Sequence, residues 1–212
     1  MTRVEDPTDV SEQLLFASGA RYVAGIDEVG RGAWAGPVSV GIAIVDRASL
    51  SSFPKGVRDS KMLSEKMREK IFPFLERSVS AYSIGHADPG ECDQYGMTEA
   101  QRLATERAFA NLTLSPDVCI IDGTVNFTGR ADAIMIRGAD RTVLTVAGAS
   151  ILAKVTRDRR MIQYHDIYPD YEFAKNKGYP SPSHIDALAR IGISEIHRKS
   201  WSFASSFAPR SS

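Results

Sequence analysis

The order of the apolar segments most constrains the fold of this 212-residue chain. Three β-rich segments come first, at residues 23–28, 37–46 and 79–85. Two shorter all-apolar segments follow later, at 118–121 and 133–136. Alternating and β-branched segments are typical of half-buried strands, and short all-apolar segments are typical of buried parallel strands. The sequence therefore predicts an α/β domain whose mixed sheet has an antiparallel meander first and parallel strands after it.

Amphipathic segments between and after these strands predict helices that pack on the sheet. They cover residues 64–76, with Ser64 as the capping residue, 97–112 and 142–164. A weaker helical pattern runs over residues 183–191. We therefore expect a sheet flanked by helices and a helical C-terminal segment.

Length and composition favour one globular domain. With 43% hydrophobic residues and no linker-like stretch in the middle, we expect a single catalytic domain over 21–201, a flexible segment over 1–20 and a flexible tail over 202–212. Cys92 and Cys119 form no CxxC motif, and the first residues lack the apolar region of a signal peptide, so we expect a cytoplasmic protein. Lys+Arg and Asp+Glu both number 26, so the net charge neither favours nor excludes a nucleic-acid partner.

Four carboxylates stand at the ends of the predicted elements. Asp27 and Glu28 end the first strand, Asp122 follows the strand at 118–121, and Asp140 lies at the start of the long helix. Clustered carboxylates repel one another unless cations neutralise them, and oxygen ligands select hard cations such as Mg²⁺ or Mn²⁺. Two such ions ~4 Å apart can assist a phosphoryl displacement. The alternative is that each acid merely ends a strand or caps a helix.

Two geometric conditions follow. Neighbouring residues on a strand face opposite ways, so Glu28 can join Asp27 only if the strand ends or bulges at residues 28–30. Asp158 lies eighteen residues beyond Asp140, about 27 Å along a continuous helix. We therefore interpret Asp158 as a surface ion pair with its neighbouring arginines rather than as a site residue.

Motifs of several other enzyme classes are absent. The sequence holds no HExxH, no GxSxG and no Walker motif. Residues 30–35, GRGAWA, match the loose dinucleotide-binding pattern, but Pro37 and a β-branched strand follow where a helix is required. A nucleotide-cofactor enzyme is therefore a weaker alternative.

Six motifs in order give the chain a close resemblance to a known family. It resembles bacterial ribonuclease HII, the type 2 ribonuclease H, from about residue 22 to residue 201. The motifs are GIDEVGRGAWAGPV, RDSKMLSEKMR, IIDG, ASILAKVTRDR, KNKGYPSPSH and HRKSW.

The resemblance implies a ribonuclease H fold and an endonuclease activity. The expected substrates are RNA–DNA hybrids and DNA duplexes with single embedded ribonucleotides, cut on the 5′ side to leave 5′-phosphate and 3′-hydroxyl ends, as in ribonucleotide excision repair. It also implies two Mg²⁺ or Mn²⁺ ions at the catalytic site with substrate. The metal-binding carboxylates of the family match Asp27, Glu28, Asp122 and Asp140.

The resemblance further implies how a ribonucleotide is recognised. The GRG motif of the family matches Gly30, Arg31 and Gly32, whose backbone would contact the ribose 2′-hydroxyl. The tyrosine of GYP matches Tyr179, which would pack on the following deoxyribose. Together these groups would read an RNA-to-DNA junction.

Phosphate contacts are the remaining expectation from the family. Lys61 would neutralise a phosphate, and Ser60 and His184 are weaker candidates for the same role. We expect a monomer with no membrane contact.

A non-catalytic module that binds nucleic acid on the same fold remains an alternative. It would use basic residues that gather late in the chain, which are otherwise interpreted as a solvated face. These are Lys154, Arg157, Arg159, Arg160, Lys175, Lys177, Arg198 and Lys199.

Overall fold

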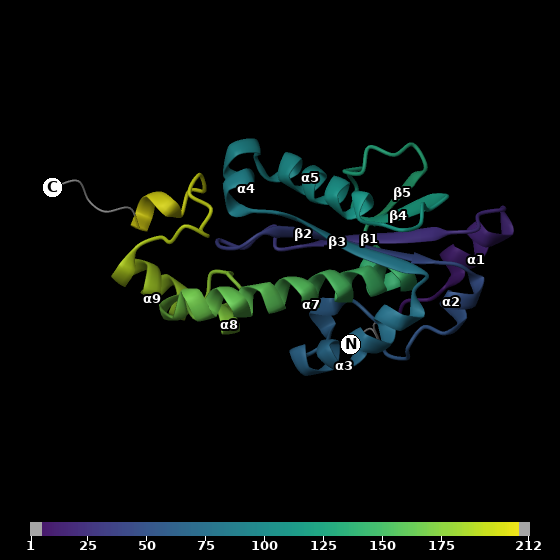
Figure 1. Ribbon diagram of the computed structural model, residues 1–212, viewed down its shortest axis with the longest axis horizontal. Helices are drawn as coiled ribbons and strands as arrows, with labels where there is room; N and C mark the ends of the chain where they lie inside the picture. The colour runs from purple at the N-terminus through teal and green to yellow at the C-terminus, as the bar shows by residue number, and fades with distance from the viewer. Residues whose placement is uncertain (1–5, 208–212) are drawn as a thin grey trace.

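A five-stranded mixed sheet forms the centre of the molecule in the computed structural model, which describes residues 6–207 (Figure 1). The strand order is β3-β2-β1-β4-β5. β1 pairs antiparallel with β2, and β2 with β3, whereas β4 runs parallel to β1 and β5 parallel to β4. The predicted meander followed by parallel strands is therefore confirmed. The strands are β1 (Val23–Val29), β2 (Val38–Val45), β3 (Ala81–Ala87), β4 (Val118–Asp122) and β5 (Ala133–Ile136).

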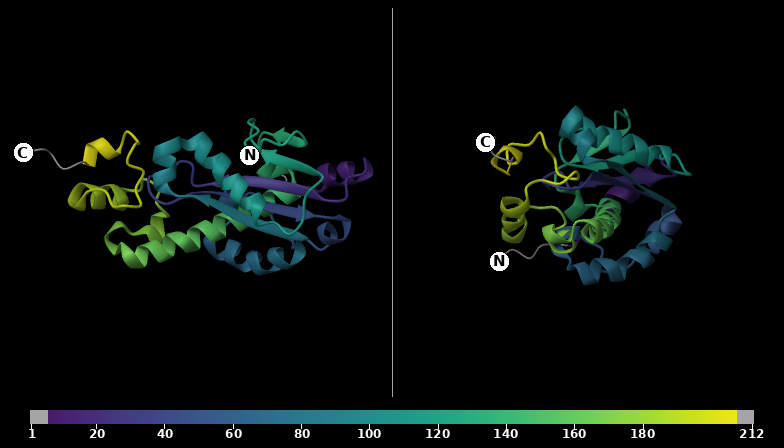
Figure 2. Two further views of the ribbon diagram at one scale, coloured as in Figure 1. Left: turned by 45° about the horizontal axis from the view of Figure 1, so that its top comes forward. Right: turned by 60° about the vertical axis from the view of Figure 1, so that its left-hand side comes forward.

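Helices cover both faces of this sheet. α4 (Pro89–Tyr95) and α5 (Met97–Ala110) lie on one face, and α3 (Glu65–Ser78) and α7 (Leu144–Ile167) lie on the other (Figures 1 and 2). Each face has its own buried apolar cluster between sheet and helices. The Ser64 hydroxyl caps α3 by accepting a hydrogen bond from the backbone N–H of Met67 at 3.3 Å, as the sequence predicts. The short elements α2 (Arg47–Ser51) and η1 (Ser60–Met62) lie in the connection between β2 and α3.

α7 lies directly on β1 because Gly25 has no side chain. A Cβ atom at Gly25 would meet the backbone of α7, at 2.5 Å from the nitrogen of Val146. The close approach brings Ser150, one turn further along α7, to the side chain of Asp27. The packing of helix on sheet therefore determines what surrounds the first carboxylate.

The predicted long helix is present and begins at Leu144, but Asp140 does not lie at its start. Asp140 lies on a separate short helix, α6 (Ala139–Thr142), and Val143 is extended with φ −113° and ψ 120° before α7 starts. Thr8 forms hydrogen bonds with the backbone groups on either side of this break. Its N–H donates to Thr142 O at 3.1 Å, and its carbonyl accepts from Leu144 N–H at 3.1 Å. The assumption of one continuous helix through Asp140 is therefore wrong.

The N-terminal segment also packs on this region. Helix α1 (Val10–Ala17) buries Phe16 and Glu12, and one Glu12 carboxylate oxygen accepts hydrogen bonds from the N–H and hydroxyl of Thr145 at 2.7 and 2.6 Å. Residues 10–17, part of the segment predicted to be flexible, thus form a helix with buried side chains. Residues 1–5 and 208–212 lie outside the described residues, and the domain boundaries stay a prediction.

A small C-terminal lobe, residues 169–207, lies beyond the end of β1, at the opposite end of the molecule from α1 (Figure 1). It surrounds an aromatic cluster in which the rings of Trp34 and Phe203 stack at 4.2 Å between centroids. The elements of the lobe are η2 (Pro169–Tyr171), α8 (Phe173–Asn176), α9 (Pro182–Ile191) and η3 (Ala204–Phe207).

No helix within residues 6–207 is long and apolar enough to span a membrane.

Candidate active site

The four predicted carboxylates come together at one edge of the sheet. β1 and β4 are parallel neighbours, and the pairing of Ile26 with Ile121 places Asp27 level with Asp122. Glu28 follows on β1, and α6 brings Asp140 to the same edge, where its charge and that of Asp122 interact. The carboxyl ends of parallel strands thus form the site, as is usual in α/β sheets.

Burial and mutual repulsion disfavour the ionised forms of the carboxylates in this cluster. Asp27 is only 3% exposed, and burial, followed by the charge of Glu28, raises its pKa to about 8. Burial also raises the pKa of Glu28 and the pKa of Asp140. Buried carboxylates with raised pKa values that interact with one another require a compensating positive charge when ionised.

Lys61 supplies one such charge. Its ammonium lies 2.8 Å from an Asp140 oxygen and 3.3 Å from an Asp59 oxygen. Burial alone would lower the pKa of Lys61, but the hydrogen bond to Asp140 and the charge of Asp27 outweigh it and raise the pKa. Lys61 therefore lies at the entrance of the cluster, bound to carboxylates.

The donor set fits a hard divalent cation. Asp27, Glu28, Asp122 and Asp140 offer only oxygen atoms, which Mg²⁺ and Mn²⁺ prefer. Within residues 6–207, however, no group of three or more His, Cys, Asp or Glu side chains converges closely enough to hold a metal ion. One Asp140 oxygen binds Lys61, and one Asp122 oxygen accepts from the backbone N–H of Ala139 at 2.8 Å. Water or substrate oxygens would have to complete any coordination shell here.

The strand carrying Asp27 and Glu28 ends next to them. β1 stops at Val29, and Gly30 has φ +90°, a backbone conformation that residues with a side chain rarely adopt. A Cβ atom on Gly30 would also lie 2.7 Å from the carbonyl oxygen of Pro37. The predicted end of the strand within residues 28–30 is confirmed.

A pocket of about 440 Å³ adjoins the carboxylates. It contains every residue that the sequence predicted to bind substrate except His184, together with one carboxylate of the cluster and a lysine of α7. Its lining residues are Glu28, Val29, Gly30, Arg31, Gly32, Ser60, Lys61, Lys154 and Tyr179.

His184 is not available to a phosphate, contrary to the expectation. Its side chain is fully buried, with Nδ1 at 2.9 Å from the carbonyl oxygen of Tyr179 and Nε2 at 2.9 Å from Nε2 of His197. Ser60 is buried as well, and its hydroxyl accepts a hydrogen bond from Ser150 at 2.9 Å. His184 therefore acts on the backbone that carries Tyr179.

Asp158 is a buried ion pair rather than a surface one. It is 3% exposed, accepts a hydrogen bond from Lys154 at 2.7 Å and lies 3.5 Å from Arg68. Its partners are not the adjacent arginines that the sequence suggested. The basic strip of the alternative hypothesis is likewise incomplete, because Arg157 and Arg198 are fully buried.

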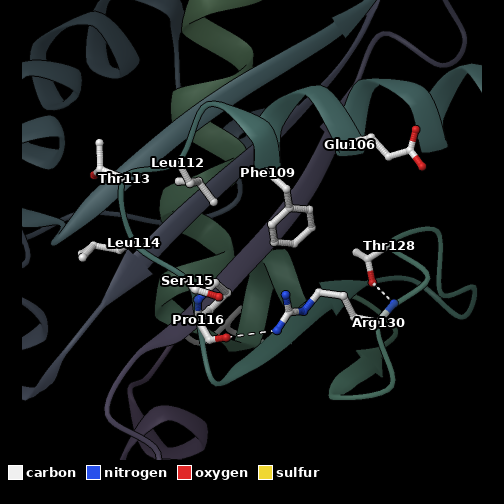
Figure 3. Close-up of a pocket in the computed structure, with 9 residues that line it drawn as sticks. All are labelled: Glu106, Phe109, Leu112, Thr113, Leu114, Ser115, Pro116, Thr128 and Arg130. Atoms are coloured by element: carbon white, nitrogen blue, oxygen red, sulfur yellow. Dashed lines mark hydrogen bonds between the residues drawn. The ribbon is translucent and has the colours of Figure 1, made fainter.

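A second pocket, of about 580 Å³, lies elsewhere and has a different character (Figure 3). It is near the start of β4, whereas Asp122 ends that strand, and it holds none of the four carboxylates. Phe109 and Leu112 form an apolar wall, and Arg130 donates a hydrogen bond to Pro116 O at 3.0 Å. Phosphoryl chemistry is therefore favoured at the carboxylate edge and not at this second pocket.

Comparison with known proteins agrees with this geometry. A family model described as Ribonuclease HII matches residues 24–204. The chain belongs to the ribonuclease HII family. A curated ribonuclease HII of Streptomyces avermitilis is 45% identical over 202 residues, which cover 94% of this chain and 85% of that protein.

Solved structures of related enzymes have the same fold. The crystal structure of ribonuclease H2 from Pyrococcus horikoshii OT3 aligns with a TM-score of 0.76 at 31% identity and covers 88% of this chain and 96% of that one. A Bst-RNase HIII solved in complex with Mn²⁺ aligns with a TM-score of 0.73 at 20% identity, over 89% of this chain and 70% of that one. The predicted ribonuclease H fold is confirmed.

As a ribonuclease HII, this protein is a metal-dependent endoribonuclease that cleaves the RNA of RNA–DNA hybrids and acts in ribonucleotide excision. The alternative of a non-catalytic binding module is thereby contradicted. The dinucleotide alternative fails on the fold, because β2 begins at Val38 where that motif needs a helix.

Proposed function

We propose that Asp27, Glu28, Asp122 and Asp140 bind two Mg²⁺ or Mn²⁺ ions together with the substrate. The observation that supports this most directly is the buried negative charge at one sheet edge, which burial and repulsion make unfavourable in the absence of cations. Two such ions, when bound, activate the attacking water and stabilise the leaving 3′-oxygen, which leaves 5′-phosphate and 3′-hydroxyl ends.

Two further residues, Lys61 and Ser60, support the carboxylates at this edge of the sheet. Lys61 holds Asp140 by an ion pair of 2.8 Å and offsets part of the negative charge. Its side chain is 69% exposed, so it is also free to meet a substrate phosphate. We propose both roles for Lys61, and we assign Ser60 a supporting role through its backbone and its contact with Ser150.

Ribonucleotide recognition is proposed for the other wall of the pocket. The turn at Gly30, Arg31 and Gly32 offers backbone groups to a ribose 2′-hydroxyl. The ring of Tyr179 faces the same pocket and lies under two cations, Lys154 at 5.7 Å and Arg157 at 5.4 Å. We propose that these walls accept both RNA–DNA hybrids and DNA duplexes with a single ribonucleotide, cut on its 5′ side.

One chain supplies all of these groups, so we propose that the enzyme works as a monomer with one catalytic domain over residues 21–201. We also propose a cytoplasmic location, because the thiols of Cys92 and Cys119 are free and buried, which suits a reducing compartment.

The test is cleavage of a DNA duplex with one ribonucleotide by Asp27→Asn and Asp122→Asn, in Mg²⁺ and in Mn²⁺. Each variant is expected to lose at least about 100-fold in rate, equivalent to ~2.7 kcal/mol of transition-state stabilisation. Asp186→Asn, an exposed acid on α9, is the matched control and should cut like the wild type. Near-normal cleavage by either test variant would contradict the assignment.

A further inference from the structure

Two arginines are buried behind the pocket, and neither has an acidic partner within the described residues 6–207. Arg157, on α7, and Arg198, in the C-terminal lobe, are both 0% exposed. Within residues 6–207, neither forms a salt bridge of 4.0 Å or less with a carboxylate. Burying an unpaired charge costs several kcal/mol, so such residues require an explanation beyond packing.

Arg198 binds the turn at residues 30–32, called the recognition turn below. Its guanidinium donates hydrogen bonds to the carbonyl oxygens of Gly30 at 2.6 Å, Arg31 at 2.7 Å and Gly36 at 3.2 Å. Burial lowers the pKa of Arg198 to about 10, which leaves the group protonated at neutral pH. Because carbonyl and N–H groups of a peptide unit are fixed relative to each other, holding these carbonyls also orients the N–H groups of the turn.

Arg157 joins the far end of the same loop to the segment that carries the tyrosine. It donates to Pro37 O at 2.8 Å and Ala35 O at 3.1 Å on one side, and to Lys177 O at 2.9 Å on the other. Its guanidinium also lies 5.4 Å from the ring centroid of Tyr179. One planar group thus contacts both walls of the pocket.

Backbone hydrogen bonds complete the connection between the walls. The N–H groups of Trp34 and Ala35 donate to Gly178 O at 2.8 and 3.1 Å, and Arg198 N–H donates to Trp34 O at 2.9 Å. A Cβ atom at Gly178 would collide with the backbone of Ala35. The recognition turn, Tyr179 and the C-terminal lobe therefore form one hydrogen-bonded unit, in which the two buried guanidinium groups donate to the backbone of both walls.

We propose that Arg157 and Arg198 are positioning residues that set the separation between the turn at Gly30–Gly32 and Tyr179, and thereby the preference for an RNA-to-DNA junction. This inference rests on the proposed function. The turn meets the ribose and Tyr179 meets the next sugar, so a change in their separation affects a junction more than a continuous hybrid. The planar fork of arginine is essential to this role, and a lysine provides the charge without it.

The test uses Arg198→Lys, Arg198→Met and Arg157→Lys on two substrates, a duplex with one ribonucleotide and a continuous RNA–DNA hybrid. kcat and KM are measured for each substrate, and cut positions are mapped on a DNA–RNA–DNA strand. We expect the ratio of kcat/KM between junction and hybrid to fall at least tenfold, and cuts to spread away from the junction. Arg190→Lys, an exposed arginine on α9, is the control. The ratio comes from one enzyme sample, so a reduced folded fraction cancels.

Two failures are distinguishable. If the wild type cuts the single-ribonucleotide duplex and Asp27→Asn does not, the proposed function holds. An unchanged ratio and cut map in the arginine variants, with both rates lowered equally or not at all, would then overturn the positioning role alone. If the wild type fails to cut either substrate, the proposed function itself is wrong.

Discussion

Replacing Asp27 with asparagine is expected to stabilise the metal-free protein while it abolishes cleavage. Burial, followed by the charge of Glu28, raises the pKa of Asp27 from 3.8 to about 8 in the folded chain. The folded state therefore keeps this proton at pH values where the unfolded state has released it. Stability from Asp27 is fully present below pH 3.8, falls as the pH rises towards 8, and is lost above it.

The size of the effect follows from the same shift. At ~1.4 kcal/mol per pKa unit, a rise from 3.8 to about 8 sets an upper limit of ~6 kcal/mol. Structural relaxation and water entry reduce such penalties, so we expect a gain on the order of 2–4 kcal/mol for the asparagine variant at pH 9. For a chain of this size, that corresponds to a rise in Tm of roughly 5–15 °C.

The measurement is thermal unfolding in a chelator at pH 6 and pH 9, for the wild type, Asp27→Asn and the control Asp186→Asn. The gap between wild type and Asp27→Asn should widen as the pH rises, and added Mg²⁺ should raise the Tm of the wild type more than that of the variant. Equal melting temperatures at both pH values, or a gap that narrows with rising pH, would refute the account of Asp27 as a buried, destabilising carboxylate.

Three other substitutions have defined outcomes. Glu12→Ala should lower the free energy of unfolding by about 1–2 kcal/mol in urea titrations, because the N–H and hydroxyl of Thr145 lose their acceptor, and Glu12→Gln should cost less. Gly30→Ala should reduce kcat/KM on a single-ribonucleotide duplex at least tenfold with a lower Tm, because φ is +90° there. Lys61→Met should move the acidic limb of the pH–rate profile to higher pH, since Lys61 lowers the pKa of Asp140; an unmoved limb would contradict that coupling.

Most of the fold was predictable from local sequence patterns. Alternation and all-apolar runs predicted the five strands, and a capping serine predicted the start of α3 at Glu65. The convergence of Asp27 and Asp122 was also predictable, because parallel neighbouring strands end at the same edge. The end of β1 near Gly30 followed from the glycines in the sequence.

Features that depend on distant contacts were not predictable. The residues around Val143 contain no proline and look helical, yet the helix breaks because Thr8 pairs with the backbone there. Arg157 and Arg198 look like surface cations, but their partners are carbonyl oxygens 120 and 168 residues away in the chain. Neither residue type nor spacing indicates that a charged side chain will be buried against backbone in this way.

When both rings are neutral, the hydrogen bonds of the His184–His197 pair can be arranged in only one donor-to-acceptor order. The N–H of Ser194 donates to Nδ1 of His197, so neutral His197 carries its own proton on Nε2 and donates it to His184. His184 then donates its Nδ1–H to the carbonyl of Tyr179. An added proton would set two N–H groups against each other, and burial lowers both pKa values, to about 3 for His197. An ionisation near neutral pH in the rate profile of this enzyme would therefore not report on these two imidazoles.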